Sequence, residues 1–351
     1  MNDYIHQFYY MSENNERDPV VNILSDCVEQ CSYLILKNKY GIEDNSFKIL
    51  LNELTFYVFD SKSNIDIMVS GNHYDLFNIK ISPYQKMDAY YEVIRELKED
   101  NMVILFTIKE MLPFSVFYSE NFIVPDNYQP FHVILIIGQD DENFFFIENP
   151  DILEKSRTQF YENNKQVGMI RKDLLKKLSE YYCGYATISI NETNIINIKE
   201  FDYVDDALNR SISNFYKENV IEDGTTYYYG INALKKLINV CNEGNISLKS
   251  MSPTNDRNML AYFDWKIWCI KNRRKYMYNY LLTQDCSEKL KEELYNSTKY
   301  WETLYRIMVK KCEKNLYMLD NSYIPYFNPI INTEERIIDY IKQYWQEKQV
   351  I

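Results

Sequence analysis

One stretch decides the fold: FHVILIIG at residues 131–138, QDDEN at 139–143 and FFFIENP at 144–150. Two apolar runs separated by five polar residues predict adjacent antiparallel strands joined by a short hairpin loop. Such pairing would bring His132, at the start of the first strand, near Asn149, at the end of the second. A histidine and the group that orients it occupy such positions in nucleophilic catalytic sites.

The sequence offers Cys27 as the nucleophile that this pair would serve. Cys27 opens a predicted helix over residues 26–40. Asp26 and Glu29 match the N-cap and N3 positions of a capping box, and apolar residues follow at helical spacing. Gly41 fits the C-terminal stop of this helix.

The first turn of a helix favours a reactive thiol. Free backbone N–H groups and the helix dipole stabilise the thiolate there, and the backbone N–H of Cys27 is itself a candidate oxyanion donor. The neighbouring Asp26 opposes thiolate formation. Cys31, one turn further on in the apolar stripe, is the rival nucleophile, and we expect it to belong to the core.

Each of these residues also has a purely structural interpretation. Cys27 alone is typical of helix packing, His132 of a hydrogen-bonded strand residue, and Asn149 before Pro150 of turn chemistry. The order of these three residues along the chain is a more specific signal than any one of them alone. A cysteine, a histidine about 100 residues later and an asparagine just before a proline match Cys-His-Asn catalysis.

The rest of the first half predicts an α+β domain over residues 1–195. An amphipathic helix at 84–99 leads into an apolar strand at 102–108, which ends before Leu112-Pro113-Phe114. A short helix at 171–181 and a closing strand at 184–190 complete it.

A helical second domain is predicted over residues 196–351. Helical periodicity dominates this half, and glycines or prolines separate its segments. The predicted helices are 204–218, 229–242, 257–282, 287–314 and 333–347. The predicted breaks are Gly224, Gly244, Pro253, Pro325 and Pro329.

Composition narrows the classes of function. The chain has 351 residues, a formal charge of −12 and seven cysteines without a CxxC pair. An acidic chain is poorly suited to nucleic acid or anionic membranes, and scattered cysteines argue against a disulfide framework or a structural zinc site. We expect no bound cofactor or metal. Without a transmembrane run or a signal-peptide pattern, the expected location is the cytoplasm.

Several short motifs resemble the butirosin biosynthesis protein H family and, more distantly, the C39-like papain-fold cysteine peptidases. They are DCVEQC at 26–31 running to Gly41, LPF at 112–114, His132 to Asp141, Asn149-Pro150, GINALKKL at 230–237 and RRKYM at 273–277. Three positions depart from the family pattern. Asn149 stands where many relatives have aspartate, and the oxyanion glutamine is absent, with Val21 in its place and Asn22 one position away. Lys109-Glu110 stands where an acidic residue often follows the buried strand.

The resemblance implies a papain-like (C39-like) fold with an added helical C-terminal domain that covers the acyl and amine site. It implies a catalytic triad of Cys27, His132 and Asn149, with the Cys27 backbone and Asn22 as oxyanion donors. Relatives in natural-product pathways, such as the protease homologues of closthioamide biosynthesis, build amides instead of cleaving them. The expected activity is therefore transfer of an acyl chain from a carrier-protein thioester, through a cysteine, to a small amine.

Three alternatives remain open at this level. The same triad with water as acceptor would make a cysteine peptidase or a thioesterase, and a papain-like fold without catalysis would be a silent scaffold. A carrier protein, with its phosphopantetheinyl arm, would need a basic docking patch. Arg171-Lys172 with Lys176-Lys177, or Lys271 with Arg273-Arg274-Lys275, would supply one, although a solvated helix face is the more common explanation of either cluster.

Overall fold

The computed structural model describes most of the chain, which divides into two compact units. The described residues are 27–41, 54–61, 64–69, 79–81, 88–124, 132–148, 167–179, 184–188, 203–244, 246–248 and 261–349. The first unit contains helix α2 and the elements from β3 to β8. The second contains β1, β2 and all described elements from residue 203 onward.

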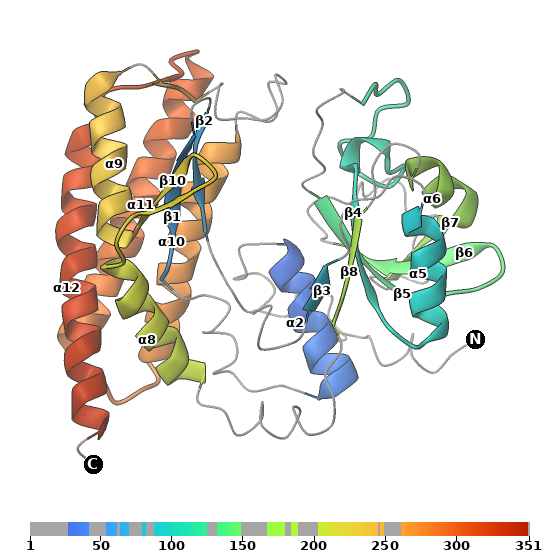
Figure 1. The fold of residues 1–351 in the computed structure, drawn as a ribbon, viewed down its shortest axis with the longest axis horizontal. Helices are drawn as coiled ribbons and strands as arrows, with labels where there is room; N and C mark the ends of the chain where they lie inside the picture. Colours follow the sequence, from blue (N-terminus) through green and yellow to red (C-terminus); the bar gives the residue numbers. More distant parts are fainter. Residues whose placement is uncertain are drawn as a thin grey trace. The chain divides into compact units, whose positions relative to one another are not determined.

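The first unit is built on an antiparallel sheet of six described strands (Figure 1). In the order in which they lie side by side, they are β3 (Ile79–Ile81), β8 (Gly184–Ile188), β4 (Val103–Thr107), β5 (His132–Gln139), β6 (Asn143–Ile147) and β7 (Val167–Arg171). An antiparallel sheet next to helices confirms the predicted α+β class.

The hairpin predicted from residues 131–150 is confirmed by β5 and β6. Leu135 pairs with Ile147 and Ile136 with Phe146, and a bulge follows before Gly138. Asp140 organises the turn, because its carboxylate accepts hydrogen bonds from two backbone N–H groups of the loop, at 2.6 and 2.8 Å. Most side chains of both strands are buried and apolar, as expected for strands that are flanked on both sides, here by β4 and β7.

Helices α5 (Asp88–Lys98) and α6 (Lys172–Ser179) supply the apolar side chains that cover one face of this sheet. The buried cluster there contains strand residues that alternate along each strand, as a pleated sheet requires. Its members are Val93, Val103, Leu105, Leu112, Phe114, Ile134, Ile136, Phe144, Phe146, Ile170, Leu175, Leu178 and Tyr185.

The predicted first helix is confirmed as α2 (Cys27–Tyr40), which begins at the proposed nucleophile. Gly41 follows it with a φ of 62°, the left-handed conformation that favours glycine at a helix end. Near its C-terminus, the Lys39 ammonium donates to the Asp100 carbonyl and the Asn101 side chain, at 2.7 and 2.8 Å. These contacts fix the last turn of α2 beside the loop that precedes β4.

The segment after β4 leaves the sheet as predicted. A 3₁₀ turn, η1 (Lys109–Met111), precedes Phe114, whose buried ring stacks on Phe146 with centroids 4.4 Å apart. A Cβ at Gly168 would collide with the same Phe146 ring. Glycine at that position of β7 therefore lets the aromatic pair lie flat on the sheet.

The second unit contains a sheet that the helical prediction missed. β1 (Tyr57–Ser61) pairs with β2 (Asn64–Met68) and with β10 (Thr225–Tyr229), which pairs in turn with β9 (Val220–Glu222). Asp223 and Gly224 both have positive φ, as a two-residue type I′ turn requires. The predicted break between helices at Gly224 is confirmed, but the break contains a hairpin that the prediction missed, although the Asp-Gly pair is its sequence signal. β1 and β2 also belong to this unit, although they precede residue 195.

Helices form the rest of the second unit, as predicted (Figure 1). They are α8 (Tyr203–Phe215), α9 (Gly230–Glu243), α10 (Ala261–Leu281), α11 (Glu288–Glu313) and α12 (Ile324–Gln349), with a short β11–β12 pair (Ile246–Ser247, Met318–Leu319) and a 3₁₀ turn, η4 (Asn321–Tyr323). One boundary was wrong: α12 begins at Ile324 and continues through Pro329. Pro325 lies in the first turn, where the missing N–H has no intrahelical partner to lose.

Candidate active site

His132 is the first residue of β5, and its side chain is buried. The imidazole Nε2 contacts Oε2 of Glu148, which follows β6 and is also buried. The exposed fractions of the two side chains are 6% and 2%. A buried carboxylate needs a partner to offset its desolvation, and the imidazole supplies it.

Thr107 lies directly opposite His132 in the β4–β5 ladder. Its side chain is fully buried, and its hydroxyl oxygen has no hydrogen-bond partner within the described part of the chain. Of the two imidazole nitrogens, Nε2 has a partner among the described residues and Nδ1 has none. The ring therefore lies in a buried polar environment at the start of β5, whose next five residues are apolar and buried.

The orientation of α2 places Cys27 and His132 at corresponding ends of their elements. Lys39 fixes the C-terminal turn of α2 beside the loop that precedes β4. Val103, at the start of β4, pairs with Ile136, so His132 lies at the end of β5 that is remote from that loop. Cys27 is likewise the end of α2 that is remote from it.

Strand alternation places His132 on the same sheet face as Ile134 and Ile136. The described residues of that buried cluster come from α5, α6, the strands and the segment after β4, and none comes from α2. A contact between Cys27 and His132 would therefore have to form at the end of the sheet, beyond the Thr107–His132 pair of the β4–β5 ladder.

The structure places the other predicted site residues only in part. The backbone of Cys27 starts α2, but its side chain lies outside the described atoms, so no sulfur–imidazole distance follows. Asn149 and Asn22 lie outside the described residues, and their roles stay predictions. Cys31 is buried, as expected for a core position. Sequence reasoning placed the orienting group at Asn149, whereas the structure brings Glu148 to the ring.

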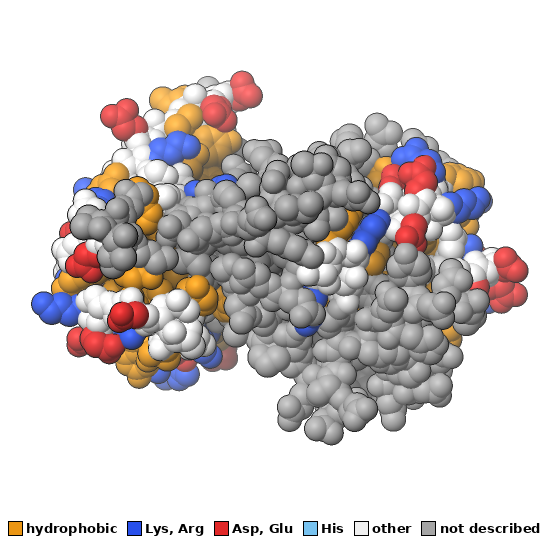
Figure 2. All heavy atoms as spheres, turned by 90° about the horizontal axis from the view of Figure 1, so that it is seen from below, with side chains coloured by type: hydrophobic (Ala, Val, Ile, Leu, Met, Phe, Trp, Pro, Cys, Tyr) orange, Lys and Arg blue, Asp and Glu red, His pale blue; other side chains and the backbone are white. Residues whose placement is uncertain are grey.

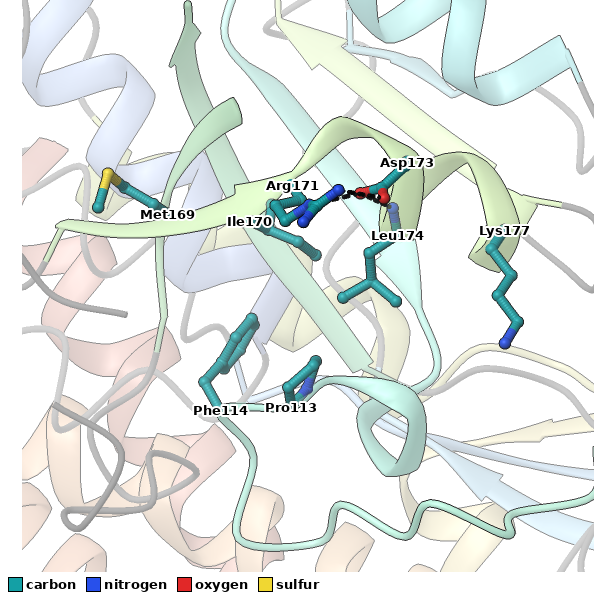
Figure 3. Close-up of a pocket in the computed structure, with 8 residues that line it drawn as sticks. All are labelled: Pro113, Phe114, Met169, Ile170, Arg171, Asp173, Leu174 and Lys177. Carbon is teal, nitrogen blue, oxygen red and sulfur yellow. Dashed lines mark hydrogen bonds and ion pairs between the residues drawn. The ribbon is translucent and has the colours of Figure 1, made fainter. Parts of the chain in front are cut away.

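A pocket of about 360 Å³ lies between α6, β7 and the segment after η1 (Figure 3). Apolar side chains line most of it, and charged ones stand beside them. The lining residues are Pro113, Phe114, Met169, Ile170, Arg171, Asp173, Leu174 and Lys177. Arg171 and Asp173 form a bidentate pair, with N–O distances of 3.0 and 2.7 Å. Lys177 therefore adds a positive charge that none of these lining residues balances.

The structure distinguishes the two predicted basic patches. Lys176 and Lys177 are exposed on α6, as a docking surface requires. Arg273 and Arg274 are buried in α10, so the patch predicted there was wrong. On the face seen in Figure 2, blue and red side chains are interspersed among the coloured atoms. Among the described residues of that face, positive and negative side chains therefore lie close together.

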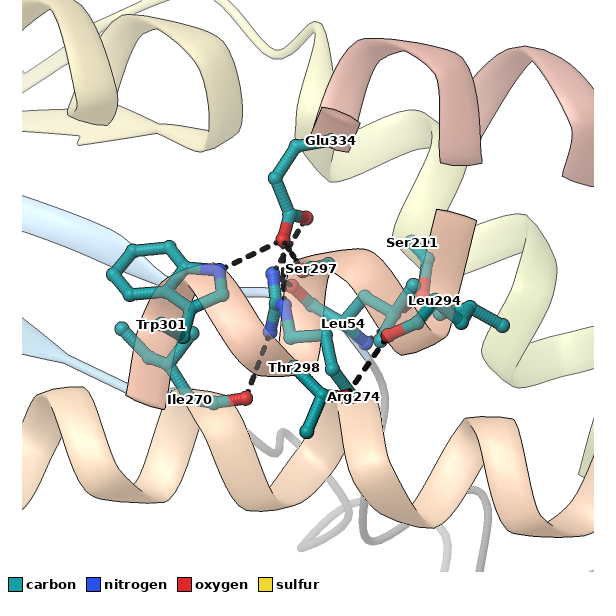
Figure 4. A network of polar contacts seen from close by, with 9 residues as sticks. All are labelled: Leu54, Ser211, Ile270, Arg274, Leu294, Ser297, Thr298, Trp301 and Glu334. Atoms are coloured by element: carbon teal, nitrogen blue, oxygen red, sulfur yellow. Dashed lines mark hydrogen bonds and ion pairs between the residues drawn. The ribbon is translucent and has the colours of Figure 1, made fainter. Parts of the chain in front are cut away.

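Arg274 is instead the centre of a buried network in the second unit (Figure 4). Its guanidinium forms a bidentate pair with Glu334, both N–O distances being 2.9 Å, and donates to the Leu54 carbonyl at 2.9 Å. Ser297 and Trp301 donate to the same carboxylate at 2.6 and 2.8 Å. The network ties α10, α11 and α12 to the segment that enters β1.

The pKa values of two buried acids in the second unit are shifted in opposite directions. Burial alone would raise the pKa of Glu334, but the charge of Arg274 and three side-chain donors outweigh it, so this pKa is lowered. Burial raises the pKa of Asp66 in β2 to about 6, against the lowering effects of the Lys266 charge and a backbone hydrogen bond from Ile67. Glu334 therefore stays charged, whereas Asp66 is protonated easily.

Compared with models of known families and with curated proteins, the chain matches none. The likeness to the butirosin biosynthesis protein H family therefore rests on its short motifs alone. None of the helices in the described ranges combines the length and the apolar run that crossing a bilayer requires. The same ranges hold no group of three His, Cys, Asp or Glu side chains arranged to bind a metal ion.

Proposed function

We propose that the protein is a papain-like, cysteine-dependent acyltransferase that forms amide bonds. One observation carries the proposal: a buried histidine–carboxylate pair at the start of β5, in a fold where α2 begins at Cys27. A histidine paired with a carboxylate is the base that activates a thiol in cysteine-dependent acyl transfer. The proposal is also supported by the position of Cys27 at the start of α2, at the same end of the sheet as His132.

In the proposed reaction, His132 takes the Cys27 thiol proton and the thiolate attacks the carbonyl of an acyl thioester. The carbon–sulfur bond to the carrier breaks, and the departing carrier thiolate takes the proton back from the imidazolium. An amine then attacks the Cys27 acyl thioester and gives a proton to the imidazole. Cys27 leaves as thiolate and is reprotonated by His132, so atoms and protons balance.

The acyl donor is proposed to arrive on a phosphopantetheinyl carrier protein, and the acceptor is a small amine. Lys177 of α6 lines the apolar pocket, and both Lys177 and its exposed neighbour Lys176 suit an acidic carrier. Amide formation requires that water be kept from the acyl-enzyme, since water would divert the intermediate to hydrolysis.

The test is intact mass spectrometry after incubation with an acyl phosphopantetheine thioester. Wild-type protein should gain one acyl mass, and Cys27→Ala should gain none. Cys31→Ala should still load, because this buried residue belongs to the core. Full loading of Cys27→Ala would rule out the covalent mechanism at this residue.

The same experiment separates the alternatives. Adding an amine should release the acyl group as an amide, whereas a thioesterase or peptidase would release it as the acid. A catalytically silent scaffold should show neither loading nor a cysteine that reacts with iodoacetamide much faster than the others. Cys27 should be that fast-reacting cysteine if the proposal holds.

A further inference from the structure

We infer that Glu148, and not Asn149, is the residue that positions His132. The inference names a member of the proposed site and depends on the proposed function for its catalytic meaning. The contact between Nε2 of His132 and Oε2 of Glu148 is its first support. Both side chains are buried, so neither can exchange this partner for bulk water without the local structure opening.

The strand register is a second, independent support. Ile136 pairs with Phe146 in the β5–β6 ladder, and both belong to the cluster under α5 and α6. Counting two residues outward along each strand reaches Ile134 and Glu148 on that same face, and two more along β5 reach His132. Diagonal neighbours on one face of an antiparallel pair lie within reach of long side chains. The backbone pairing itself thus directs Glu148 toward the imidazole.

This pairing decides which ring nitrogen does the chemistry. A carboxylate accepts hydrogen bonds, so the neutral imidazole carries its proton on Nε2 and donates it to Glu148. Nδ1 is then the nitrogen that carries the lone pair, and no described residue forms a hydrogen bond with it. Nδ1 is the atom that would take the thiol proton. A carboxylate also stabilises the imidazolium formed in that step better than a neutral amide does.

The distinguishing experiment reads the imidazole tautomer directly. The chain has only three histidines, so the ¹⁵N signals of His132 can be assigned in labelled full-length protein from their loss in His132→Gln. Wild-type protein should show the Nε2–H tautomer. Glu148→Gln should keep it, because the amide oxygen still accepts, and Glu148→Ala should give a mixture of tautomers. Asn149→Ala should leave the spectrum unchanged.

Acyl loading of Cys27 provides the second measurement. Glu148→Ala should slow loading by on the order of 100-fold, with substantial rescue by Glu148→Gln, and Asn149→Ala should cost far less. Thr107→Val is the matched control, since it alters the neighbour of the ring but removes a hydroxyl without a described partner. It should change neither the tautomer nor the loading rate.

The inference and the proposed function fail in different ways. An altered tautomer in Asn149→Ala, or an unaltered one in Glu148→Ala, would overturn the role of Glu148. Should Glu148→Ala fail to fold, the Asn149→Ala spectrum still decides, since it must match wild type. If the tautomers behave as expected while Cys27→Ala still loads, the positioning role stands and the covalent mechanism falls.

Discussion

Each unit of the protein buries a carboxylate against a nitrogen-bearing side chain, and the two nitrogen-bearing side chains differ in how many of their nitrogens have partners among the described residues. In the second unit, Glu334 accepts from Arg274, Ser297 and Trp301, and Arg274 also donates to a backbone carbonyl. In the first unit, His132 uses one nitrogen on Glu148, and the Thr107 hydroxyl beside it has no partner in the described ranges.

The difference separates a structural role from a chemical one. A buried ion pair is stable when hydrogen bonds saturate both partners, and Arg274–Glu334 meets that condition while holding three helices together. A histidine with one nitrogen held and the other available can accept and return a proton. The arginine cannot, because its guanidinium stays protonated throughout the accessible pH range. The comparison therefore assigns stability to the second unit's pair, and it supports the proton-transfer role proposed for the first unit's pair.

The largest loss of stability should come from breaking the Arg274–Glu334 pair. Glu334→Gln leaves the buried Arg274 charge unmatched and should lower the free energy of unfolding of the second unit by about 3–5 kcal/mol. All four tryptophans lie beyond residue 260, so tryptophan fluorescence during urea unfolding reports on this unit.

The matched control for that prediction is Arg336→Ala. Arg336 makes an equally bidentate pair with Glu293, at 2.8 and 2.9 Å, but its side chain is 47% exposed. Its loss should cost less than about 1 kcal/mol, because solvent screens the pair. Equal losses in the two variants would contradict the distinction between buried and exposed pairs.

A pH-dependent effect of up to about 3 kcal/mol is expected at Asp66. With its pKa raised to about 6, the folded protein holds a proton at Asp66 that the unfolded chain releases near pH 4. Asp66 therefore makes its full contribution to the free energy of unfolding below pH 4, and this contribution declines as the pH rises toward 6. The Asp66→Asn side chain does not titrate, so the free energy of unfolding of this variant should rise relative to that of wild type over the same interval. A pH-independent difference in urea unfolding would refute the assignment.

The smallest effect compares two buried hydroxyls. Ser297→Ala removes a donor to Glu334 and should destabilise the second unit by about 1.5–3 kcal/mol, as for hydrogen bonds to charged groups. Thr107→Val removes a hydroxyl without a described partner and should be neutral or stabilise the first unit by about 1 kcal/mol. Calorimetry on both variants checks the signs. Destabilisation by Thr107→Val of the size seen in Ser297→Ala would mean that the hydroxyl has a partner after all.

The sequence by itself determined most of the local structure. Capping and apolar spacing located the helix that begins at Cys27, and two apolar runs around a polar loop located β5 and β6. Helical periodicity likewise located α8 to α12. These features depend on neighbours within about four residues along a helix or across a tight turn, so composition and spacing suffice.

Only the tertiary structure decided where charges and hydroxyls find their partners. Arg274 looks like a surface base in sequence, yet it is buried because Glu334, sixty residues later, meets it across two helices. The small sheet of the second unit forms from strands separated by more than 150 residues, and no local pattern encodes that pairing. Strand alternation by itself does not choose between Glu148 and Asn149 as the residue that faces His132. The register between β5 and β6, set by packing over the whole sheet, is what turns Glu148 toward His132.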